Sequence, residues 1–125
     1  MTATQRATEL AQAAGAAAQD KLAEDVLGLD VSDQLALTDV FVIASAPSER
    51  QVDSIVEAVE ERLLRLGAKP LRREGQKEGR WVLLDFGDIV VHVLHSEDRE
   101  FYGLERLWKD CPVVVMPQAR PAAGG

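Results

Sequence analysis

The sequence predicts one small domain of the α/β (α+β) class, in which helices pack against a β-sheet. Three observations support this prediction. Apolar residues recur at helical spacing before residue 23 and again between residues 48 and 67. Two apolar runs, 81–86 and 89–94, flank the pair Gly87-Asp88, which is typical of a two-residue hairpin turn. A length of 125 residues allows one ordinary core but not two.

The first half of the chain predicts two helices with two strands between them. Residues 4–23 are rich in alanine and predict a weakly apolar helix, with Gly15 unfavourable in its middle. Residues 26–31 and 39–44 are strand candidates. Ser48-Glu-Arg-Gln51 has the form of a capping box and starts a strongly amphipathic helix. Gly67 can adopt the left-handed conformation at which helices often end.

The second half predicts mostly strands. A short strand at 70–74 and a polar loop at 75–79 precede the hairpin. Ser96 then caps a last helical segment, which Gly103 divides into two short turns. Residues 112–116 form an edge strand. We expect a single domain over residues 1–116 and a flexible C-terminal tail over residues 117–125.

The hairpin turn fixes which side chains share a face of the sheet, because side chains alternate along a strand. One face is uniformly apolar and predicts core: Val82, Leu84, Phe86, Ile89, Val91 and Val93. The opposite face mixes large apolar groups with an acid and an imidazole: Trp81, Leu83, Asp85, Val90, His92 and Leu94. A helix could cover this mixed face and leave Asp85 and His92 as an internal pair. Alternatively, the face is an exposed binding surface, since large aromatics with few charges are typical of interface centres.

Composition restricts the classes of partner and compartment. The net charge of −7 disfavours a DNA-binding role and suits a basic protein partner. One cysteine, Cys111, allows no intrachain disulfide, which fits a reducing compartment. We find no signal peptide and no run of apolar residues long enough for a membrane span. We therefore expect a cytoplasmic protein without a membrane partner.

Catalysis is the less favoured class of function. Asp39, Asp85, Asp88 and His92 would fit metal-assisted phosphoryl chemistry, but acids are common at strand ends and turns for structural reasons. Ser45-Ala-Pro-Ser48 lacks the glycines of a phosphate loop or a nucleophile elbow. We predict a protein that is not an enzyme, with no cofactor, no metal site and no catalytic residue.

A basic cluster surrounds the polar loop and consists of Lys69, Arg72, Arg73, Lys77 and Arg80. It is either a solvated loop beside Glu74 and Glu78 or an auxiliary contact to RNA phosphate. Near the C-terminus, Tyr102 and Trp108 are interpreted as hydrophobic anchors of the last helix.

Several segments in order resemble one family. They are Thr38-Asp-Val-Phe-Val-Ile-Ala-Ser45, Ser48-Glu-Arg-Gln-Val52, Glu74-Gly75, Trp81-Val-Leu-Leu-Asp-Phe-Gly-Asp-Ile-Val-Val-His-Val93, Arg99, Tyr102 and Leu104-Glu-Arg-Leu-Trp108. Over residues 20–110 the chain resembles the ribosomal silencing factor (Iojap-like) family. The resemblance implies a mixed β-sheet flanked by helices, with a nucleotidyltransferase-like core that lacks the catalytic residues.

The resemblance also implies a function and a site. Such a protein is a translational repressor that binds the large ribosomal subunit through ribosomal protein uL14. It blocks joining of the small subunit when nutrients are short, and it forms a homodimer when free. The docking residues would be Trp81, Leu83, Asp85, His92 and Leu94, with Glu74 and Glu105 pairing with basic side chains. The alternative is a residual nucleotide-binding or metal-dependent enzyme using Asp39, Asp85 and Asp88.

Overall fold

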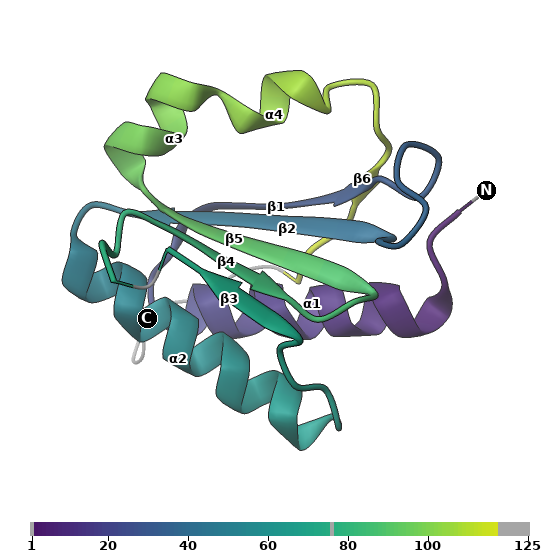
Figure 1. Cartoon of the computed structure of the whole chain (residues 1–125), viewed down its shortest axis with the longest axis horizontal. Helices are drawn as coiled ribbons and strands as arrows, with labels where there is room; N and C mark the ends of the chain where they lie inside the picture. Colours follow the sequence, from purple (N-terminus) through teal and green to yellow (C-terminus); the bar gives the residue numbers. More distant parts are fainter. Residues whose placement is uncertain (1, 76, 118–125) are drawn as a thin grey trace.

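The computed structural model describes residues 2–75 and 77–117. Its elements are α1 (Gln5–Asp20), β1 (Glu24–Asp30), β2 (Val40–Ala46), α2 (Glu49–Arg65), β3 (Arg72–Glu74), β4 (Trp81–Asp85), β5 (Ile89–His95), α3 (Ser96–Tyr102), α4 (Leu104–Leu107) and β6 (Val113–Val114). Figure 1 shows three layers: α1 and α2 lie below the sheet, and α3 and α4 lie above it. The predicted tail, 117–125, falls outside the described residues except for Pro117.

The sheet is mixed, as predicted. Its strand order is β3-β4-β5-β2-β1-β6. Only β2 and β5 pair in parallel, while the other neighbouring strands are antiparallel. The chain after β2 turns into α2 on one face, and the chain after β5 turns into α3 on the other (Figure 1). Both faces of the central strands are therefore covered, and the expected open sheet face is absent over β2 and β5.

The main core lies between the sheet and the α1–α2 layer. The hairpin has the predicted register, with Leu84 opposite Val91 and Val82 opposite Val93. Every residue of the uniformly apolar hairpin face is buried in this core, together with the apolar stripes of both helices. The prediction from the two-residue turn is confirmed, because the turn leaves one register in which all these side chains face the helices.

The start of α2 confirms half of the predicted capping box. Ser48 Oγ accepts a hydrogen bond from the Gln51 backbone N–H at 3.2 Å. The Gln51 side chain, however, donates to the backbone oxygens of Lys21 and Leu22 at the end of α1, both at 3.1 Å. It thus satisfies carbonyl groups that the end of α1 leaves without helical partners. At the other end of α2, Gly67 has φ of +83°, as expected for a helix stop.

A second, smaller core fills the space beneath α3 and α4. It contains Leu29, Val31, Phe41, Ile43, Val90, Leu94, Leu104 and Cys111. The cap of α3 differs from the prediction: His95 Nδ1 accepts from the Glu97 backbone N–H at 3.2 Å, while Ser96 Oγ donates to Glu24 Oε1 at 2.5 Å. Gly103, with φ of +57°, separates α3 from α4 as predicted.

Candidate functional site

The predicted docking face is divided by the helices above it. His92 and Leu94 are 5% and 0% exposed, so they belong to the second core. The expectation that they face solvent is wrong because α3 and α4 cross this side of β5, and Leu104 packs there. Asp85 and His92 do not form the internal pair considered from the sequence. Asp85 Oδ1 instead accepts from the Gly87 backbone N–H at 2.8 Å and holds the hairpin turn.

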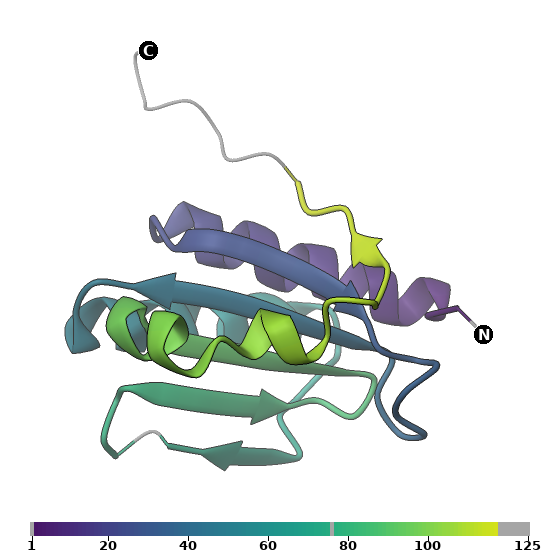
Figure 2. The ribbon, with the colours of Figure 1, turned by 90° about the horizontal axis from the view of Figure 1, so that it is seen from above.

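The outer half of the same face is still accessible. Figure 2 shows that α3 and α4 lie over the central strands and leave β4 and β3 uncovered. Trp81 and Leu83 on β4 are consequently half-buried, with their inner sides packed against the second core. Glu74 on β3 pairs with Leu83 across the strands, so its side chain lies on this same face.

Three aromatic side chains form the clearest exposed feature on this side. We call Trp81, Phe101 and Tyr102 the aromatic patch. Phe101 is 81% and Tyr102 is 56% exposed. The ring centroids of Trp81 and Tyr102 lie 5.3 Å apart, and those of Tyr102 and Phe101 lie 5.0 Å apart. Tyr102, interpreted as a hydrophobic anchor, contacts Trp81 but stays more than half exposed. Trp108 packs against Phe41, with their ring centroids 5.1 Å apart.

Sequence reasoning missed Phe101 as a surface residue. The sequence feature that could have indicated it is a second large aromatic residue beside Tyr102, at the end of a short helix. Helical periodicity could not place it, because Gly103 is left-handed and breaks the register between α3 and the buried residues of α4. Leu107 on α4, which is 76% exposed, escaped notice for the same reason.

Trp81 is held from beneath by a buried histidine. Its Nε1–H donates to His92 Nδ1 at 3.2 Å. Burial lowers the pKa of His92 from 6.5 to about 4, so the imidazole is neutral at physiological pH and can accept this hydrogen bond. Its Nε2 atom is buried and has no partner within the described part of the chain.

The acids predicted to pair with a partner are in different situations. Glu74 is exposed at the sheet edge, beside Leu83. Glu105 is held inside the chain, where its Oε1 accepts from Arg99 Nε at 2.5 Å. Arg99 is 9% exposed and also donates to Ser45 Oγ at 3.1 Å. The charge of Glu105 therefore neutralises a buried guanidinium, which is its main role here.

The basic cluster is largely neutralised within the chain. Arg73 donates to Glu60 on α2 at 2.6 Å and 3.3 Å. Arg80 donates to Asp98 on α3 at 2.9 Å and 3.1 Å and lies 3.7 Å from Glu49. This hydrogen bond from Arg80 lowers the pKa of Asp98. Arg72 lies 3.8 Å from Asp85. The residues proposed for RNA contact are Arg72, Arg73, Lys77 and Arg80. The three arginines among them thus have acidic partners.

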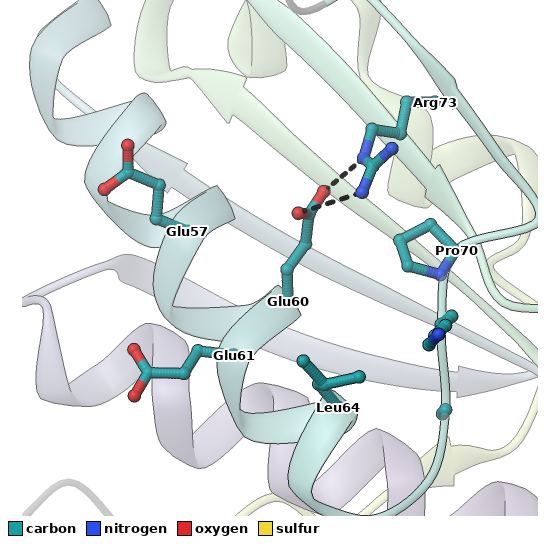
Figure 3. A pocket seen from close by; sticks show the side chains of 8 residues that line it. Glu57, Glu60, Glu61, Leu64, Pro70 and Arg73 are labelled. Carbon is teal, nitrogen blue, oxygen red and sulfur yellow. Dashed lines mark hydrogen bonds and ion pairs between the residues drawn. The ribbon is translucent and has the colours of Figure 1, made fainter.

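A groove of about 570 Å³ lies between α2 and the segment leading into β3. Its lining includes Glu57, Glu60, Glu61, Leu64, Pro70 and Arg73. Figure 3 shows the ion pair that joins Glu60 of α2 to Arg73 of β3. Glu61, also in the lining, pairs with Arg65 of α2 at 2.6 Å. The groove lies on the helical layer opposite the aromatic patch.

Two of the acids considered for catalysis, Asp39 and Asp85, hold local structure with their carboxylates. Asp39 Oδ2 accepts from the Thr4 backbone N–H at 2.9 Å and fixes the start of α1. Asp88 lies in the hairpin turn, where its backbone oxygen accepts from the Asp39 backbone N–H. Among residues 2–75 and 77–117, no three His, Cys, Asp or Glu side chains converge as metal ligands. Within the same residues, no helix combines the length and apolar character needed to cross a bilayer.

The fold and its surface define a class: a small α/β domain with a mixed sheet, closed cores on both sides of its central strands, and an exposed aromatic patch of the kind found at protein interfaces. The model of the family described as "Ribosomal silencing factor during starvation" matches residues 4–124. The chain belongs to this ribosomal silencing factor family.

Individual relatives agree with this assignment. The chain is 42% identical over 100 residues to the "Ribosomal silencing factor RsfS" of Bacillus subtilis, covering 80% of this chain and 85% of the relative. It is 33% identical to the mouse "Mitochondrial assembly of ribosomal large subunit protein 1", covering 69% of this chain and 39% of that one. A crystal structure of a Chromobacterium violaceum protein superposes with a TM-score of 0.78 at 32% identity, covering 92% of each chain.

Proposed function

We propose that this protein is a cytoplasmic translational repressor that binds the large ribosomal subunit through ribosomal protein uL14 and blocks joining of the small subunit. The family membership supports a role in ribosomal silencing. The observation that carries the proposed site is the aromatic patch, in which Trp81, Tyr102 and Phe101 contact in series while remaining accessible.

The patch has the composition of a binding centre. Tryptophan and tyrosine are over-represented among residues that dominate binding energy, because they bury a large area with few rotatable bonds. Here the rings are already packed against one another, which reduces the side-chain entropy that docking would cost. Removal of one such anchor typically weakens binding by about 2 kcal/mol or more.

The surrounding charge favours a basic partner. Glu74 lies exposed on the same face, and the whole chain carries a net charge of −7. A carboxylate at the rim of an apolar contact would meet lysine or arginine side chains of a ribosomal protein and orient the complex. The patch and Glu74 thus replace the larger set of docking residues expected from the sequence, in which His92 and Leu94 are buried.

The proposed mechanism is occlusion. A folded domain seated on an intersubunit surface of the large subunit would occupy space that the small subunit needs. Affinity then sets the degree of repression, and no bond is made or broken. Repression is reversible, since dissociation of the factor restores the free surface.

Sedimentation of purified ribosomal subunits tests this function. We expect the protein to comigrate with the large subunit and to reduce the fraction of joined ribosomes, with Trp81→Ala losing both effects. Leu64→Ala is the matched control, because Leu64 is an exposed leucine on α2 in the opposite layer. Circular dichroism checks that both variants fold. Equal joining of the subunits with and without the wild-type protein would refute the proposal.

A further inference from the structure

The hydrogen bond between Trp81 and His92 links the surface to the core. The two residues lie on neighbouring antiparallel strands, with Leu94 directly opposite Trp81 and His92 two residues away on the same face. They are therefore diagonal neighbours, close enough for long side chains to touch. Trp81 is half-buried, whereas His92 is 5% exposed. One end of the contact is fixed in the second core, and the other reaches the aromatic patch.

His92 has little freedom to move. Its strand, β5, lies between β4 and β2 in the sheet. Its ring packs edge-to-face on Phe41, with centroids 4.8 Å apart, and Phe41 packs in turn on Trp108. A ring enclosed in this way is a rigid acceptor, so the direction of the Trp81 indole N–H follows from it.

Packing alone does not account for an imidazole at this position. Because Nδ1 accepts from Trp81, the neutral ring carries its proton on Nε2, and Nε2 is buried without a partner among residues 2–75 and 77–117. A buried donor without an acceptor is unfavourable, and an apolar ring would fill the same volume without that penalty. The hydrogen bond to Trp81 is the interaction that an apolar ring could not provide.

We propose that His92 is a positioning residue, which fixes the Trp81 indole beside Tyr102 and presents its outer surface to the partner. This inference rests on the proposed function, because it assigns how that surface is prepared for docking. The benefit is preorganisation: an indole already held in one orientation loses less freedom on binding. His92 contacts no partner itself, since α3 and α4 cover it.

Two substitutions separate positioning from packing. His92→Phe keeps an aromatic ring and removes the acceptor, while His92→Gln offers a carbonyl oxygen that can replace Nδ1. In His92→Phe we expect the Trp81 indole N–H resonance in the ¹⁵N–¹H spectrum to shift and to exchange faster with water. We expect the affinity for purified large subunits to fall roughly threefold to tenfold. His92→Gln should restore the wild-type indole N–H resonance and the affinity. Trp81→Phe identifies that resonance, because it removes the Trp81 indole.

The outcomes distinguish this inference from the proposed function. If His92→Phe binds large subunits within twofold of wild type while Trp81→Ala does not bind, positioning is wrong and the docking surface stands. If Trp81→Ala binds as well as wild type, the docking surface itself fails, and with it the role assigned to His92. The wild-type protein supplies an independent test should His92→Phe not fold. A Trp81 indole N–H that exchanges as fast as free indole would overturn the inference.

Discussion

At the scale of single residues, buried polar groups connect the surface of this protein to its interior. His92 is the clearest case, since burial keeps it neutral and one ring nitrogen accepts from Trp81. Arg99 is the second, with its guanidinium neutralised by Glu105 and bonded to Ser45. Arg99 tethers the α3–α4 layer to β2, whereas His92 joins β5 to Trp81 on β4. The presentation of the aromatic patch therefore depends on groups that solvent hardly reaches.

The burial of His92 makes stability depend on pH. Its pKa is about 4 in the folded chain and near 6.5 in the unfolded chain, so between these values only the unfolded chain takes up the proton. The associated stability is complete above pH 6.5, falls as pH decreases towards 4, and changes no further below 4. The total loss is on the order of 3 kcal/mol.

Urea unfolding at pH 7.5 and pH 5 measures this dependence. We expect the free energy of unfolding to fall by about 2 kcal/mol between these values in the wild type. His92→Gln should show a much flatter dependence, because glutamine places no titrating group at this buried position. Equal pH slopes in His92→Gln and the wild type would contradict the assignment.

At the scale of elements, two glycines form a notch for the C-terminal segment. A Cβ atom at Gly15 in α1 would lie 2.4 Å from Met116 Sδ, and one at Gly28 in β1 would lie 2.4 Å from Met116 Cε. Met116 therefore occupies the space that both residues leave. This explains a glycine inside a helix, which propensity alone disfavours. The Met116 side chain and the pairing of β6 with β1 together hold the segment around Met116 against α1 and β1.

This packing predicts that Gly15→Ala and Met116→Ala are not additive. Alanine in a helix interior is favoured over glycine by about 1 kcal/mol, but at Gly15 the new methyl group must displace Met116. We expect Gly15→Ala to be neutral or destabilising in the wild type and to stabilise the Met116→Ala variant by about 1 kcal/mol. A double-mutant cycle by chemical denaturation measures the coupling. The same stabilisation in both backgrounds would show that Met116 does not fill the notch.

At the scale of the whole molecule, the layers separate two surfaces. The α1–α2 layer carries the groove lined by Arg73 and Glu60, and the opposite side carries the aromatic patch with Glu74 at its edge. Arg73 and Arg80, near β3, pair with acids of the helices, and the molecule as a whole carries a net charge of −7. Such a molecule is attracted to basic surfaces over a Debye length, about 8 Å at physiological ionic strength.

We therefore expect association with large subunits to depend on ionic strength through Glu74. Glu74→Gln should lower the association rate several-fold in dilute salt and have little effect at high salt, where exposed charges are screened. Glu57→Gln, which removes an exposed acid from the opposite layer, is the matched control. Stopped-flow or surface-based kinetics can measure the rates. Equal effects of the two substitutions would mean that net charge, and not the position of Glu74, governs encounter.

The sequence alone determined the local features of this protein, because they depend on residues close together in the chain. The hairpin register followed from the two-residue turn, the limits of α2 from Ser48 and Gly67, and the family from ordered motifs. Only the tertiary structure decided how the mixed face divides. Three features depend on contacts between distant segments. They are the covering of His92 by α3 and α4, the outward direction of Phe101 before Gly103, and the choice of acid that each arginine meets. Neither periodicity nor composition encodes such contacts directly, since the same pattern fits a covered face and an open one.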